Sequence, residues 1–205
     1  MSADVDLSAD VSAFFAGLVG EALEERRVDT TDATRAYVSG LLADYARPGG
    51  RTRDALERPV TLLLAEAKES VGRERFERLR ALGDGTLYVC GFFAEHLENR
   101  GVALRYVESI GAQAYDGAAS MLRQGGIARE QSSVPDVFGE LAAHFETFVG
   151  LIESIANRLV TQRGASSNGA VVKLYERWLR TGSNELAAAL GAQGLVPMRG
   201  GGGVH

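Results

Sequence analysis

Two histidines, His96 and His144, are the side chains of this sequence whose type best suits acid–base or metal chemistry. The chain of 205 residues has three histidines and one cysteine, which excludes a disulfide framework and any multi-cysteine metal site. Carboxylate-bridged di-iron bundles need Glu-x-x-His pairs on facing helices. Phe93 and Leu141 stand three positions before the two histidines, so neither pair exists. We therefore predict no metal site and keep His96 and His144 as weak candidate ligands.

The predicted helix that carries His96, residues 86–99, has two apolar stripes. One face holds Leu87, Cys90, Ala94 and Leu97, and the spacing i, i+3, i+7 places Val89, Phe92 and His96 on a second face. A helix at the surface of a single layer needs only one such stripe. The second stripe therefore either packs in the core, or faces a partner subunit or a ligand cavity. Both alternatives stay open.

The candidate pocket or interface residues come from this second stripe and from the aromatic side chains of a long helix that follows. They are Val89, Phe92, Phe93, His96, Phe145 and Phe148. If the helices bring them together, they would line a pocket for a small apolar ligand.

The sequence lacks the motifs of several common binding sites and catalytic sites. No phosphate-binding glycine loop, no His-Glu-x-x-His and no Ser-His-Asp arrangement occurs. Cys90 lies between apolar positions of its helix, which predicts a small buried side chain rather than a nucleophile. Gly83, Asp84 and Gly85 are predicted to end one helix and begin the next. We predict no catalytic residue, and an enzyme is the less favoured alternative.

Apolar side chains recur at helical spacing along most of the chain. Helices are expected around residues 11–23 and 36–45, and over 59–70, 73–82, 86–99, 102–123, 136–162, 170–180 and 184–190. No stretch shows the alternation of a strand. We predict an all-α, single-domain bundle of seven or eight helices over residues 1–190. Residues 102–123, apolar or small over most of their circumference, are expected to form a central buried helix. Residues 191–205 are Gly-rich and predicted to be a disordered tail.

The charge and hydropathy of the chain exclude two classes of partner. Its net charge of -5 argues against nucleic-acid binding, which needs a basic face. No stretch has the roughly 18 uninterrupted apolar residues of a membrane span. The N-terminus is acidic where a secretory signal would be basic. We expect a cytoplasmic protein without nucleic-acid or membrane partners.

One short segment resembles a known family. Leu82-Gly83-Asp84-Gly85 is similar to the kinked distal helix of the haem oxygenases. That resemblance implies a haem held by a histidine near the N-terminus, whereas the first histidine of this chain is His96. We assign no family and predict no cofactor, and leave haem or a metal as alternatives.

Two functions follow from these patterns. The first is a non-catalytic helical protein that acts by binding or protein–protein interaction as a homodimer, because the surplus apolar stripe offers a second packing surface. The alternative is a helical bundle that binds a small molecule or a cofactor in a pocket near His96.

Overall fold

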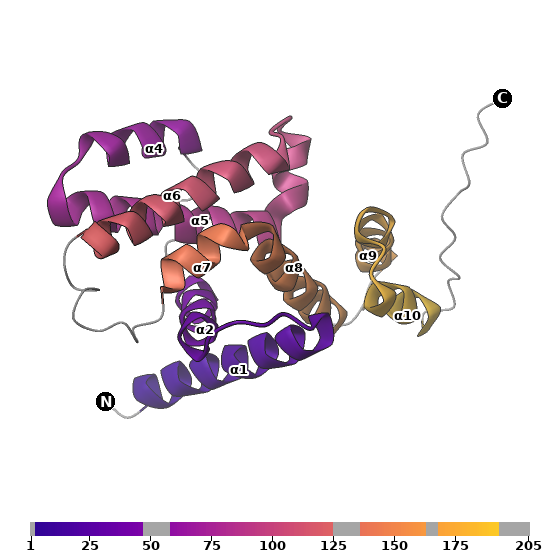
Figure 1. Ribbon diagram of the computed structural model, residues 1–205. Helices are drawn as coiled ribbons and strands as arrows, with labels where there is room; N and C mark the ends of the chain where they lie inside the picture. The colour runs from indigo at the N-terminus through magenta and orange to yellow at the C-terminus, as the bar shows by residue number, and fades with distance from the viewer. Residues whose placement is uncertain (1–2, 47–57, 125–135, 163–167, 193–205) are drawn as a thin grey trace. The chain divides into compact units, whose positions relative to one another are not determined.

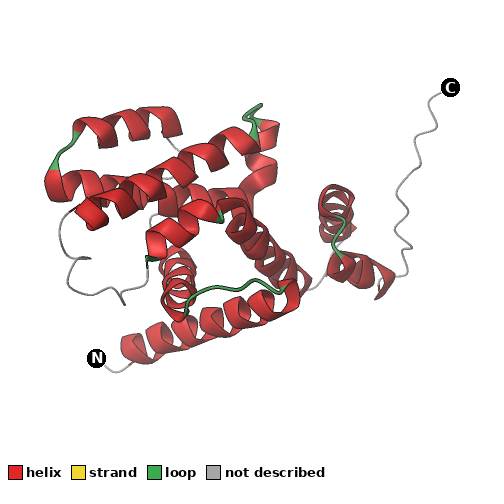
Figure 2. Ribbon diagram, in the orientation of Figure 1, coloured by secondary structure: helices red, strands yellow, loops and turns green. Residues whose placement is uncertain are grey.

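The computed structural model describes residues 3–46, 58–124, 136–162 and 168–192. Within these ranges the structure consists of helices and connecting turns, with no strand (Figure 2). The predicted all-α fold is confirmed. From residue 193 onward, the predicted tail lies outside the described residues.

The helices group into two compact units, Met1–Glu153 and Ser154–His205. Figure 1 labels them as α1 (Ala3–Arg26), α2 (Asp32–Ala46), α4 (Val60–Glu69), α5 (Gly72–Asn99), α6 (Leu104–Gln124), α7 (Val137–Ala143), α8 (Phe145–Gln162), α9 (Asn168–Thr181) and α10 (Asn184–Ala192). The boundary between the units falls within α8. The single domain over residues 1–190 stays a prediction.

Helix α5 runs without interruption through Gly83, Asp84 and Gly85, so the predicted boundary at these residues is wrong. Glycine weakens an isolated helix by roughly 1 kcal/mol relative to alanine. Here residues 82–91 are all buried, and packing against neighbouring helices outweighs that propensity. A Cβ atom on Gly83 would lie 2.5 Å from Cδ1 of Tyr115. Gly83 therefore allows α5 and α6 to approach closely.

Helix α6 packs against α4, α5 and α7 in the first unit, but it is not buried on all sides as the sequence predicted. Helix α6 buries one face, which includes Val107, Ile110 and Tyr115, and exposes Tyr106 and Asp116 on the other. The error arose because small residues made α6 look apolar all round. Some of these small residues are close-packing positions, since a Cβ on Gly111 of α6 would collide with Thr86 and Phe145.

The long helix predicted over residues 136–162 is divided at His144. This residue has φ -118° and ψ 30°, outside the helical region, and separates α7 from α8. Leu141 before the bend and Phe145 after it are both buried, so apolar contacts are kept on both sides. Asp136 caps α7 by accepting a hydrogen bond from the Gly139 N–H at 2.9 Å.

The second unit contains a small core of its own. Four buried side chains of α9 and α10 form it, Leu174, Trp178, Leu186 and Leu190. The two helices meet at a turn in which Gly182 has a φ of +65°, a conformation that favours glycine. No described helix of either unit has the length and apolar character needed to cross a membrane.

Candidate functional site

A cavity of about 340 Å³ lies among α4, α5 and α6 of the first unit, which pack against one another (Figure 1). Its volume falls at the small end of the range of about 300–1,000 Å³ typical of ligand sites. The lining residues are Arg58, Pro59, Val60, Thr61, Thr86, Val89, His96, Leu97, Arg100, Val102, Tyr106 and Val107.

The part of the cavity formed by Thr86 and Val89 of α5 and Val107 of α6 is buried. Val89 is 3% exposed and Val107 is 2% exposed. Thr86 is also buried, and its hydroxyl donates to the carbonyl oxygens of Leu82 at 2.8 Å and Gly83 at 2.9 Å. Because the Thr86 hydroxyl already has hydrogen-bond partners inside its own helix, it does not need one from a ligand. An apolar group can therefore occupy this part without leaving a buried donor unpaired.

The rim of the cavity carries exposed polar and basic side chains. Arg58 and Pro59 precede α4, His96 and Arg100 lie at the end of α5, and Tyr106 lies on the first turn of α6. None of the lining residues, all of them in the described part of the chain, is an aspartate or a glutamate. The rim is therefore basic in a protein whose overall charge is negative.

The two rim arginines differ in their partners. Arg58 donates from both terminal nitrogens to the carboxylate of Glu66 on α4, with Nη1 3.1 Å from Oε2. This hydrogen bond is the main cause of a pKa for Glu66 below its ordinary value. Within the residues that the structure describes, Arg100 forms no ion pair. Its guanidinium can therefore receive an anion without breaking an existing pair.

The structure places the six candidate pocket residues in different surroundings. Val89 and His96 both line the cavity. Phe92 and Phe93 are half-buried and pack with the ring of Tyr88, and Phe93 lies at a kink of α5 with φ -126° and ψ 27°.

Phe145 and Phe148 belong to the core rather than to the cavity lining. They are 4% and 1% exposed, and the Phe145 ring contacts that of Tyr115. His144 is not a lining residue either, so the cavity contains one of the two candidate histidines. No described group of three His, Cys, Asp or Glu side chains is arranged to hold a metal ion.

A buried carboxylate joins three helices on another side of the same unit. Asp84 of α5 is 7% exposed, and its Oδ1 accepts hydrogen bonds from Tyr37 of α2 at 2.6 Å and Tyr115 of α6 at 2.9 Å. Burial, followed by the negative charge of Asp84, raises the pKa of both tyrosines, so both hydroxyls stay protonated and donate. This Tyr–Asp–Tyr cluster holds the helices together.

This cluster was not predicted from the sequence, because Asp84 was expected at a helix end. An acidic residue inside an otherwise apolar run was the available indication, since a buried carboxylate needs donors nearby. Tyr37 and Tyr115 lie on inward-facing positions of their helices and could have been matched to it.

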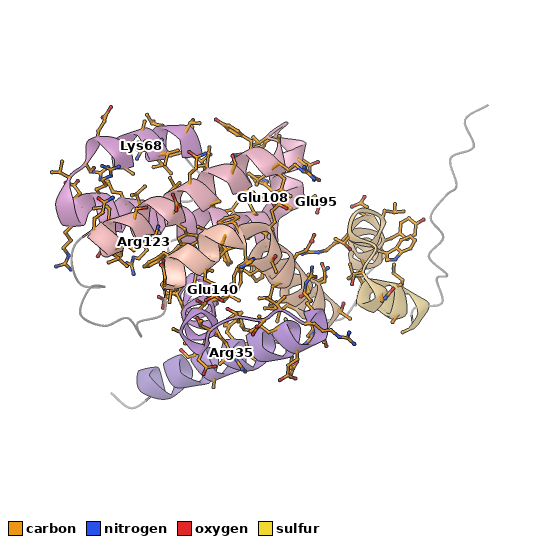
Figure 3. The ribbon with its side chains drawn as sticks, in the orientation of Figure 1. Arg35, Lys68, Glu95, Glu108, Arg123 and Glu140 are labelled. Carbon is orange, nitrogen blue, oxygen red and sulfur yellow. The ribbon has the colours of Figure 1, made fainter. Side chains whose placement is uncertain are left out.

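Glu140 of α7 caps the start of α2 (Figure 3). Its carboxylate accepts hydrogen bonds from the hydroxyls of Thr30, Thr31 at 2.7 Å and Thr34 at 2.6 Å, and from the Thr31 N–H at 3.1 Å. Partial burial acts to raise the pKa of Glu140, but the hydrogen bonds from Thr30, Thr34 and Thr31 outweigh it and the pKa is lowered. Glu140 therefore joins α7 to α2.

Two further groups have raised pKa values for a structural reason. Burial, with a smaller effect of Glu108, raises the pKa of the Cys90 thiol, which is 1% exposed. This keeps the thiol protonated and makes it a poor nucleophile. Burial and then the charge of Glu146 raise the pKa of Glu108. Neither group lines the cavity.

Comparison with known proteins does not assign the chain to a family. No family model, no curated protein and no solved structure matches the chain. The chemistry of the cavity therefore carries the functional inference.

Proposed function

We propose that this chain is a helical protein that binds a small, largely apolar molecule in the cavity among α4, α5 and α6. The observation that carries the proposal is the combination of a cavity of about 340 Å³ with a buried apolar part and an exposed polar rim. Small-molecule sites have this composition, in which apolar contacts supply affinity and a few polar groups fix orientation. Two residues of the second apolar stripe of α5 line the cavity: Val89 belongs to its buried apolar part and His96 to its exposed rim.

The same residues favour binding over catalysis. The lining residues, all within the described ranges, include no Asp, Glu, Cys or Ser that could act as a nucleophile or as a partner for His96. The buried cysteine and the buried aspartate of the first unit have structural roles, as described above. A non-catalytic binding protein is therefore the function that these side chains support best.

The test uses an uncharged fluorescent probe, N-phenyl-1-naphthylamine, which brightens in apolar sites. Thr61 is exposed on the first turn of α4 and lines the cavity. The variant Thr61→Trp places a large ring at the cavity wall and should weaken probe binding about tenfold or more, because the volume for the probe is lost. Thr147→Trp is the matched control, since Thr147 is exposed on α8 and does not line the cavity.

The control should bind the probe as the parent does. Absence of probe binding by the parent protein would contradict the proposal, as would equal affinity of the Thr61→Trp and Thr147→Trp variants.

Two expectations from the sequence remain part of the proposal, a homodimer and a cytoplasmic location. The homodimer rests on the second apolar stripe of the sequence alone, because single exposed apolar side chains such as Phe14 on α1 and Leu62 on α4 do not mark an interface. Sedimentation velocity at micromolar concentration tests it, and a single monomeric species would contradict it.

A further inference from the structure

We propose that the ligand carries a carboxylate head group on an apolar body, and that Arg100 binds this carboxylate. The inference rests on the proposed function, since it needs the cavity to be a binding site. It goes further by naming the ligand class and the residue that selects it.

The charge of the cavity supports an anionic ligand. Among its lining residues are two arginines and a histidine but no acidic side chain, although acidic residues outnumber basic ones in the whole chain, 27 to 22. A cation in this site would meet Arg100, which forms no ion pair with any described residue, whereas the charge of Arg58 is compensated by Glu66. An anion would meet charges of opposite sign at the rim and none of its own sign in the lining.

The arrangement along α5 supports a ligand with two ends of different polarity. Thr86, Val89, His96 and Arg100 follow one another at spacings of three, seven and four residues and all line the cavity. The first two are buried and the last two are exposed. One face of the helix therefore passes from an apolar surface to a basic one, as an amphipathic molecule requires.

Arg100 is the better placed of the two arginines to bind the head group. Arg58 already donates twice to Glu66, whereas Arg100 forms no ion pair with any described residue. A guanidinium presents parallel N–H donors that match the two oxygens of a carboxylate. Tyr106, which is 50% exposed, lies on the same rim, and its hydroxyl can donate a hydrogen bond to the same carboxylate.

The test compares three molecules with the same eight-carbon chain, octanoate, 1-octanol and octylammonium, in competition with N-phenyl-1-naphthylamine. Octanoate should displace the probe from the parent protein at a concentration about tenfold lower than 1-octanol, because a charged hydrogen-bonded pair is gained. Octylammonium should be the weakest. The variant Arg100→Gln should lose the preference for octanoate, so that octanoate and 1-octanol displace the probe from it at similar concentrations.

Arg75→Gln is the control, because Arg75 is an exposed arginine of the same helix that does not line the cavity. It should behave as the parent does. Equal affinity of the parent for octanoate and 1-octanol would overturn the inference, and so would an Arg100→Gln variant that still prefers octanoate. Both results would leave the proposed function standing, whereas failure of the parent to bind the probe at all would remove both.

Discussion

The ring of Tyr115 on α6 lies directly against the backbone of Gly83 on α5. A Cβ atom added to Gly83 would come within 2.5 Å of Cδ1 and 2.6 Å of Cε1 of that ring. Tyr115 is fully buried, and its hydroxyl donates to Asp84, the residue next to Gly83. The close approach of ring and backbone and the hydrogen bond to Asp84 therefore depend on each other, and they fix how α5 packs on α6.

Replacing Gly83 with alanine should destabilise the protein even though alanine is the better helix former. The added methyl group must displace a buried ring, which typically costs about 1–3 kcal/mol. Gly40→Ala on α2 is the matched control, since Gly40 is exposed and a Cβ there would meet nothing within 4 Å. That variant should gain about 0.5–1 kcal/mol. Urea unfolding followed by circular dichroism measures both, and equal stability of the two variants would refute the packing described.

Removing either tyrosine hydroxyl of the Tyr–Asp–Tyr cluster should also destabilise the fold. Tyr37→Phe and Tyr115→Phe each remove a hydrogen bond to a buried carboxylate, a loss of about 1.5–3 kcal/mol. Tyr106→Phe provides the comparison, because Tyr106 is 50% exposed and its change should be nearly neutral. Thermal unfolding of the three variants measures the difference. Equal melting temperatures of Tyr37→Phe and Tyr106→Phe would show that the hydrogen bond from Tyr37 to Asp84 does not stabilise the fold.

The Glu140 cap should make stability depend on pH in the acid range. Its pKa is lower in the folded protein than in the unfolded chain, so the carboxylate stabilises the fold above the ordinary glutamate value of about 4.3. This contribution is lost as the pH falls through the lower, folded value. At neutral pH Glu140→Gln should therefore lose about 1–3 kcal/mol, and the difference from the parent should shrink below about pH 4. A difference that is constant with pH would contradict the role of the charge.

Glu108 should show the opposite sign. Its pKa is raised in the folded protein by burial and by Glu146, so the charged form disfavours folding. The stability tied to protonated Glu108 is present below the ordinary value and is lost as the pH rises through the raised, folded value. Glu108→Gln should accordingly raise the melting temperature at pH 7 by about 1–3 °C. Glu98→Gln, at an exposed position of α5, should leave it nearly unchanged, and a lower melting temperature for Glu108→Gln would contradict the prediction.

Helical periodicity predicted most of the elements because most helices of this chain bury one face. It fails at Gly83, where the glycine predicts a helix end but α5 continues. Glycine has the same local propensity whether it ends a helix or admits a neighbouring ring, and only the position of Tyr115, 32 residues later, distinguishes the two. It fails again at His144, where the apolar spacing continues through a bend in the backbone.

The cavity could be predicted only in part for a similar reason. The stripe on α5 indicated Val89 and His96 because both lie on one helix face. Arg58 and Thr61 reach the cavity through the packing of α4 on α5 and α6, which no local pattern encodes. Phe145 was grouped with the candidates for its aromatic ring, although its partners are Gly111 and Tyr115 in the core.

The most direct test of the proposed binding site is a titration of the ¹⁵N-labelled protein with octanoate, followed by ¹H–¹⁵N correlation spectra. Saturable shifts should concentrate in the backbone amides of Thr61, Val89, Arg100 and Tyr106 and their neighbours on α4, α5 and α6. The amides around Tyr37 and Glu140 should shift little, since neither residue lines the cavity. An absence of saturable shifts, or shifts concentrated away from α4 and the end of α5, would contradict a binding site in this cavity.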